Sequence, residues 1–61
     1  MTKKELKILS EDFERRLKEL HGERDIEGAH MCADEILCDL LESLEMYNVV
    51  DAFHKVPRWY S

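Results

Sequence analysis

The sequence predicts an all-α protein: a helical hairpin of two long helices, followed by a short third helix and an aromatic C-terminal tail. Apolar residues recur at three- and four-residue intervals along three segments, and residues that commonly cap helices stand between those segments. Only two Gly and one Pro occur, while 38% of the residues are charged, a balance that suits exposed amphipathic helices. We expect a single domain over residues 1–61, because a chain of this length supplies one small core.

The first helix is expected over about residues 3–21. Thr2 and Glu5 have the spacing of a capping box, in which a hydroxyl and a carboxylate satisfy free amides at a helix start. His21-Gly22 is typical of a helix end. A start at Ser10 is the alternative, and it would leave residues 4–9 extended. The apolar stripe of this helix consists of Leu6, Leu9, Phe13, Leu17 and Leu20.

The second helix is expected over about residues 26–45, with Asp25 as its N-cap. Gly28 falls in its first turn, where a truly interior glycine costs about 1 kcal/mol relative to alanine. The small residues of the helix lie toward its N-terminal end, where a neighbouring helix can approach closely. One broad apolar face consists of Ile26, Ala29, Ala33, Ile36, Leu37, Leu40, Leu41 and Leu44.

The third helix is expected over about residues 49–56, capped by Asn48 and ended by Pro57. Trp59 and Tyr60 follow, and we expect these aromatics to fold back on the core or to fill a partner's groove. Because a chain of this length gives a marginal core, we also expect two subunits to pair their hairpins into a bundle-like homodimer.

Charge is unevenly distributed along the chain, whose formal net charge is −5. Residues 1–24 hold seven Lys/Arg and six Asp/Glu, whereas residues 25–61 hold two and eight. Such an acidic field disfavours direct binding of nucleic acid and fits a partner protein with a basic surface. The sequence has no apolar run long enough to cross a membrane and no signal region at its start, so we expect a cytoplasmic protein without membrane contact.

Few residues of the sequence are candidates for catalysis or for binding a metal ion or small ligand. His30 and Asp34 lie one helical turn apart, a spacing that allows two side chains to bind one metal ion or a small ligand. The favoured interpretation is a histidine hydrogen-bonded to a neighbouring carboxylate, because no further ligand has a fixed relation to this pair. Cys32 and Cys38 are interpreted as inert, reduced thiols among acidic neighbours. Since no catalytic or phosphate-binding motif occurs, we expect neither enzymatic activity nor a cofactor.

The outward side of the second helix is the candidate partner-binding surface. Met31 and Cys38 are seven residues apart and are expected to stack in one apolar strip with an acidic rim. Alternatives are an ordinary solvated face or a contact with the second subunit. Trp59 and Tyr60 are candidate binding anchors as well, although a structural lid is the favoured role. The candidate partner-binding residues are Met31, Asp34, Glu35, Cys38, Asp39, Glu42, Trp59 and Tyr60.

A pattern in the second half of the chain resembles a group of small proteins encoded by phages and prophages. The residues that carry it are Asp25, Glu27, His30, Ala33, Asp34, Leu37, Leu40, Leu41, Leu44, Val49, Val50, Ala52, Phe53, Trp59 and Tyr60. The resemblance covers a little over half the chain and implies no particular reaction. Those sequences usually carry a helix-stopping glycine near the position of Glu45, so the boundary between the second and third helices stays open. Small acidic helical phage proteins resemble inhibitors of bacterial defence systems, such as anti-CRISPR proteins, which implies binding of a host protein.

Three functional hypotheses follow. The first is a non-enzymatic interaction protein that docks an acidic helical surface onto a basic host protein. The second is a small-ligand or metal-binding module that uses His30 and Asp34. The third is a structural accessory protein whose only partner is a second copy of itself.

Overall fold

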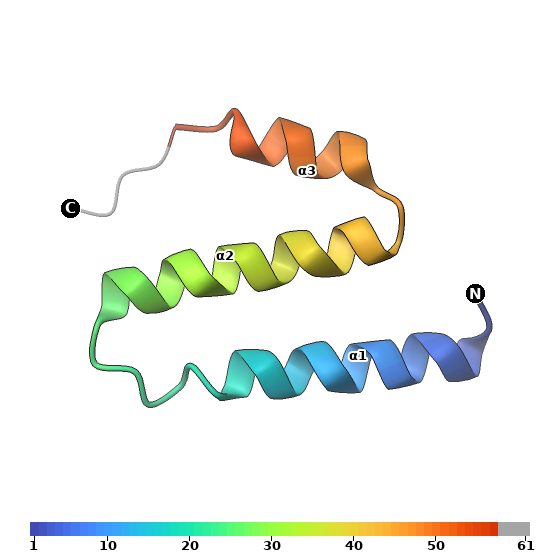
Figure 1. Cartoon of the computed structure of the whole chain (residues 1–61), viewed down its shortest axis with the longest axis horizontal. Coiled ribbons are helices and arrows are strands. Elements are labelled where there is room, and N and C mark those ends of the chain that lie inside the picture. Colours follow the sequence, from blue (N-terminus) through green and yellow to red (C-terminus); the bar gives the residue numbers. More distant parts are fainter. Residues whose placement is uncertain (58–61) are drawn as a thin grey trace.

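The computed structural model describes residues 1–57, which form three helices and no strand. Helix α1 spans Lys3–Lys18, α2 spans Ile26–Ser43 and α3 spans Tyr47–His54. Helix α2 lies between the other two and runs antiparallel to both (Figure 1). The predicted all-α architecture of two long helices and a short third is confirmed.

Helix α1 begins where the capping-box spacing predicts. The backbone amide of Glu5 donates to Thr2 Oγ1 at 3.1 Å, and the backbone amide of Thr2 donates to Glu5 Oε1 at 3.0 Å. Ser10 lies inside the helix and donates its hydroxyl to the Lys7 carbonyl oxygen, so the alternative start at Ser10 is wrong. At the other end the helix stops at Lys18, about three residues before the predicted end. The chain tightens there, because the next amides donate to carbonyls three residues back.

Helix α2 has the predicted cap, since the backbone amide of Gly28 donates to Asp25 Oδ1 at 3.1 Å. Its C-terminal end is separated from α3 by a tight reversal at Glu45, whose φ of 60° lies in the left-handed region. The amides of Glu45 and Met46 donate to the carbonyls of Glu42 and Leu41, both at 2.9 Å. This pair of bonds is a Schellman motif, the helix ending that usually requires glycine.

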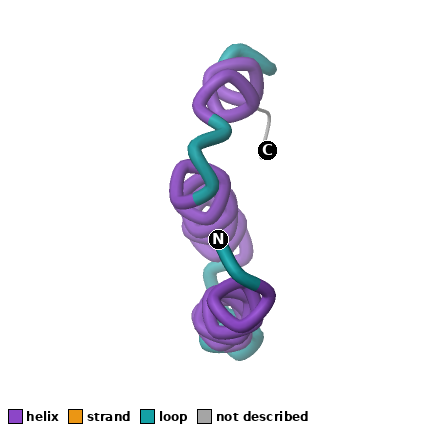
Figure 2. The backbone as a smooth tube through the Cα atoms, turned by 90° about the vertical axis from the view of Figure 1, so that its right-hand side faces the viewer, coloured by secondary structure: helices purple, strands orange, loops and turns teal. Residues whose placement is uncertain are grey.

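The three helices form a single layer, as the view along its edge shows (Figure 2). The Cα atoms extend 40 × 28 × 9 Å. Helices α1 and α3 each contact α2, and within residues 1–57 they do not contact each other. In this part of the chain only Phe13, Cys38 and Val50, one residue from each helix, are buried. The core is therefore confined to two narrow seams, and both broad sides of the layer are open.

The two broad sides differ in chemistry, because successive helical residues turn by about 100°. Leu37 and Asp39 consequently project from opposite sides of α2. We call one side the apolar face; its exposed apolar side chains are Leu6, Ile26, Leu37, Met46, Val49 and Phe53. We call the other side the polar face; its residues include Asp12, Arg16, Glu35, Asp39, Glu42 and Tyr47.

Candidate interaction surface

Helix α2 carries most of the unbalanced acidity of the molecule. Its 18 residues include five Asp/Glu and no Lys or Arg. The neighbouring α1 holds six Lys/Arg and four Asp/Glu in 16 residues. Positive and negative charge are thus segregated between adjacent helices of the same layer.

Two of the three acidic residues in the second half of α1 are paired within the helix. Asp12 accepts from both Arg15 and Arg16, and Glu14 lies 3.0 Å from Lys18 Nζ. The hydrogen bond and negative charge of Asp12 raise the pKa of the Arg15 guanidinium. Because these pairs form at exposed i to i+3 and i to i+4 positions, this part of α1 presents a nearly neutral surface.

The acids of the polar face on α2 are not paired in this way. Glu35, Asp39 and Glu42 are exposed, and none of their carboxylates forms an ion pair within residues 1–57. Spacings of four and three residues put them in one row along the helix, and like charges in such a row repel each other. The row therefore directs a negative field into solvent.

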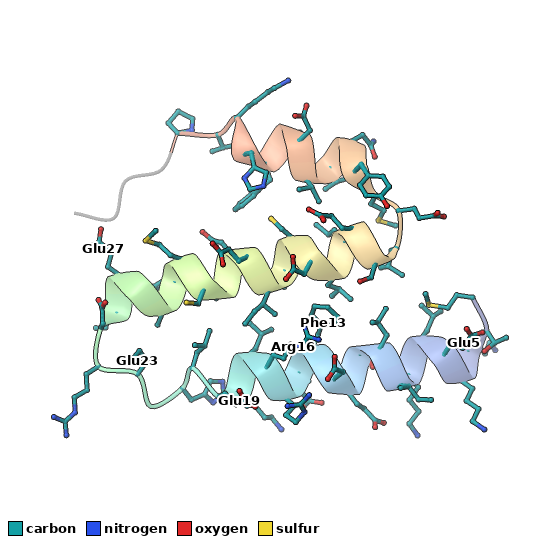
Figure 3. The ribbon with its side chains drawn as sticks, viewed as in Figure 1. Glu5, Phe13, Arg16, Glu19, Glu23 and Glu27 are labelled. Atoms are coloured by element: carbon teal, nitrogen blue, oxygen red, sulfur yellow. The ribbon has the colours of Figure 1, made fainter. Side chains whose placement is uncertain are left out.

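A shallow, open hollow borders this row over the seam between α1 and α2. Its lining is Leu9, Asp12, Phe13, Arg16, Asp39, Glu42, Ser43 and Tyr47. The Phe13 side chain rises from α1 toward α2 (Figure 3), and the Arg16 guanidinium lies 4.5 Å from the centroid of its ring. Arg16 also forms an ion pair with Asp12 at 3.0 Å, so the guanidinium in this hollow is paired with a carboxylate of its own helix, α1. Neither acid on the α2 side, Asp39 or Glu42, forms an ion pair with the guanidinium.

The predicted apolar strip of Met31 and Cys38 does not exist as an outward surface. Met31 is 50% exposed, but Cys38 is only 5% exposed. Helix α3 packs along this side of α2 and buries Cys38 in the same seam as Val50. The prediction that Cys38 lies on a partner-binding surface is therefore wrong.

The other predicted partner-binding residues divide into two groups. Glu35, Asp39 and Glu42 lie together on the polar face. Asp34 is half-buried and lies nearer the α3 side of α2, away from that row. Trp59 and Tyr60 lie outside the described residues.

His30 and Asp34 remain one turn apart on α2, with His30 exposed. His30 shares a small hollow with Leu17, Leu20, His21, Ala29 and Ala33 on the seam with α1. Within residues 1–57, no three His, Cys, Asp or Glu side chains come together in a way that could hold a metal ion. The structure thus gives the metal-binding hypothesis no third ligand in this region.

The sequence interpretation missed the apolar face. Ile26 and Leu37 were expected in the core, yet they are 71% and 47% exposed. In the sequence, the apolar arc of the second helix is broader than one neighbouring helix can cover, and this width indicates that part of the arc stays exposed. A broad arc requires a second layer, and α3 instead extends the first layer.

Comparison with protein-family models, with curated proteins and with solved structures finds no match for this chain. None of the helices in residues 1–57 combines the length and the apolar character that crossing a membrane requires.

Proposed function

We propose that this chain is a non-enzymatic interaction protein whose polar face docks onto a basic surface of another protein. The observation that supports this proposal is the exposed row of Glu35, Asp39 and Glu42, none of which forms an ion pair within residues 1–57. Four acidic side chains elsewhere in residues 1–57 form ion pairs with basic partners; these are Asp12, Glu14, Glu19 and Asp51.

The unpaired row lowers the stability of the free protein. Each like-charge pair at this spacing destabilises a helix by about 0.2–0.5 kcal/mol. A partner with clustered Lys or Arg would remove that repulsion on binding and would be steered toward the row before contact. The adjoining shallow hollow, lined by polar side chains together with Leu9, Phe13 and Tyr47, gives a partner side chain a concave place to bind.

The resemblance of the second half of the chain to phage and prophage proteins supports a more specific form of the proposal. In that form the partner is a bacterial host or defence protein, and the chain is an inhibitor that acts in the host cytoplasm. The comparisons with known proteins add no support for or against this form.

The test is capture of a partner from a host lysate by three versions of the full chain. These are the native chain, the triple variant Glu35→Lys/Asp39→Lys/Glu42→Lys, and a control triple variant, Glu11→Lys/Glu23→Lys/Glu27→Lys. Both variants change the formal net charge equally, but the control changes lie off the polar face. We expect the native chain and the control to retain the same protein, and the first variant to lose it by at least roughly tenfold in affinity. Equal loss in both variants would show that net charge alone decides binding, and no loss would remove the polar face from the proposal.

A further inference from the structure

The apolar face is the largest feature of the molecule that the proposed function does not use. It carries exposed apolar residues from all three helices, including Leu6, Leu37 and Val49 at 43%, 47% and 44% exposure. They come from different helices of one layer, so they form one broad face rather than a groove within a single helix pair. Apolar patches that combine several elements in this way mark surfaces that another layer covers.

The accessible surface of the chain is too large for a compact monomer. It measures 5216 Å², whereas a folded monomer of this mass exposes about 4,200 Å². The surplus of about 1,000 Å² is comparable with the roughly 800 Å² that each partner buries in a stable protein–protein interface. The surplus surface of one chain is therefore about as large as the area that one subunit contributes to a stable interface.

Trp59 and Tyr60 each carry about 150–250 Å² of surface, and a side chain that packs on a face removes a similar area of that face from solvent. The tail could thus cover part of the apolar face, whereas a second copy of the chain brings a whole layer of the same size.

The distribution of charge is compatible with a second copy of the chain on the apolar face. Two chains with a formal net charge of −5 repel each other overall. The row of Glu35, Asp39 and Glu42, however, lies on the polar face, opposite Leu37, so two apolar faces can meet without burying this row of carboxylates. Burial of unpaired carboxylates would otherwise oppose association strongly.

We propose that a second copy of this chain covers the apolar face, and that the protein is a homodimer of two stacked three-helix layers. Leu37, midway along the central helix, then lies near the centre of the interface. Both polar faces point outward, on opposite sides of the dimer, which gives the assembly two equivalent acidic surfaces. This arrangement replaces the expected pairing of two-helix hairpins with a pairing of whole layers. It is independent of the proposed docking of the polar face.

The first experiment is sedimentation equilibrium of the full chain over two decades of protein concentration, together with thermal unfolding at the same concentrations. We expect a mass of twice the 7.3 kDa chain, and a melting temperature that rises with concentration because folding and association are linked. A monomeric mass throughout, with a melting temperature independent of concentration, would overturn the proposal.

Variants then locate the interface. Leu37→Glu should raise the dimer dissociation constant roughly a hundredfold or more, because a symmetric interface buries the new charge twice. Ile8→Glu is the matched control: Ile8 is 60% exposed on the side of α1 that faces away from α2, so its replacement should leave the mass unchanged. If Leu37→Glu does not fold, Leu37→Ala serves instead and should weaken the dimer by roughly tenfold. A dimer that Ile8→Glu disrupts and the Leu37 variants do not would place the interface elsewhere and contradict the proposal.

Two other occupants give distinct results. If the tail covers the apolar face, the native chain is monomeric and a chain ending at Pro57 loses stability. If a different protein covers it, the native chain is monomeric alone and the Leu37 variants lose that protein. Either result overturns the second copy as occupant. The triple charge reversal on the polar face should leave the dimer mass intact while partner capture is lost, so the two proposals fail independently.

Discussion

The backbone amide of Met46 donates a hydrogen bond to the carbonyl of Leu41 at 2.9 Å, and this bond closes the reversal between α2 and α3. Glu45 lies inside the reversal with φ at 60°, a conformation that side chains other than glycine adopt at a cost of about 1–2 kcal/mol. The chain therefore keeps the geometry of a glycine-type helix end without the residue that suits it.

Replacement of Glu45 by glycine should stabilise the protein. The left-handed conformation would no longer be strained, while the more flexible unfolded chain offsets part of the gain, so we expect a net increase of about 1 kcal/mol in the free energy of unfolding. For a domain of this size that corresponds to a melting temperature higher by about 4–8 °C at fixed protein concentration. Glu45→Ala is the control, because it removes the charge and keeps the Cβ atom. An equal gain from alanine would show that charge, not backbone conformation, limits stability here.

The N-cap of α2 gives a second prediction, through the interaction of Asp25 with Gly28. A Cβ atom added at Gly28 would lie 2.5 Å from Asp25 Oδ2, so Gly28→Ala must displace the carboxylate that caps the helix. Loss of an N-cap costs about 1 kcal/mol and the glycine-to-alanine change within a helix gains up to about the same amount. We therefore expect Gly28→Ala to have a net effect near zero.

The same substitution should stabilise a chain in which Asp25 is already alanine, because the obstructing carboxylate is gone. A double-mutant cycle by urea denaturation measures the difference, and we expect a coupling free energy of about 1 kcal/mol between the two positions. Additive effects would mean that the cap carboxylate moves aside without loss of its hydrogen bond.

The extent to which the sequence predicts this structure depends on whether local or distant residues decide a feature. Thr2 and Glu5 bond within their own turn, so their spacing was sufficient to place the start of α1. The burial of Cys38 depends instead on the side of α2 along which α3 returns. That direction follows from the left-handed turn at Glu45, which no propensity of glutamate predicts.

In the candidate site, too, the features set by local spacing were predictable and those set by distant contacts were not. The acidity of α2 was evident from composition, and Glu35, Asp39 and Glu42 share one face because helical spacing alone places them there. The apolar face was not predicted, since Ile26 and Leu37 look like core residues in any amphipathic helix. Only the single-layer arrangement of the three helices leaves them exposed.

The capping box of α1 should make stability depend on pH in the acid range. The backbone and hydroxyl hydrogen bonds of Thr2 lower the pKa of Glu5 below its ordinary value of about 4.5. A carboxyl group with a depressed folded-state pKa contributes stability above its unfolded-state pKa and loses that contribution as the pH falls through the folded-state pKa. Glu5→Gln should therefore lower the melting temperature at neutral pH, and the difference from the native chain should shrink as the pH falls below about 4.5.

Thermal unfolding of both chains across the acid range measures this effect. Glu11→Gln is the control, because it removes a carboxylate from the same helix without touching the cap. A difference between Glu5→Gln and the native chain that stays constant with pH would show that the carboxylate charge contributes nothing to the cap.

The two cysteines give the most direct check on how α3 is placed. Cys32 is exposed and Cys38 is buried between α2 and α3, although both belong to one helix. A thiol-specific reagent should therefore modify Cys32 roughly tenfold or more faster than Cys38 in the native protein, because Cys38 reacts only after α3 detaches locally. In denaturant the two rates should converge.

Single variants assign the two phases of that reaction. Cys32→Ser should leave only the slow phase and Cys38→Ser only the fast one, provided that circular dichroism shows each variant to be folded. Fast modification of Cys38 in folded protein would mean that α3 does not cover this side of α2. In that case Met31 and Cys38 would again form one accessible strip, and the partner-binding surface would have to be extended from the polar face to include it.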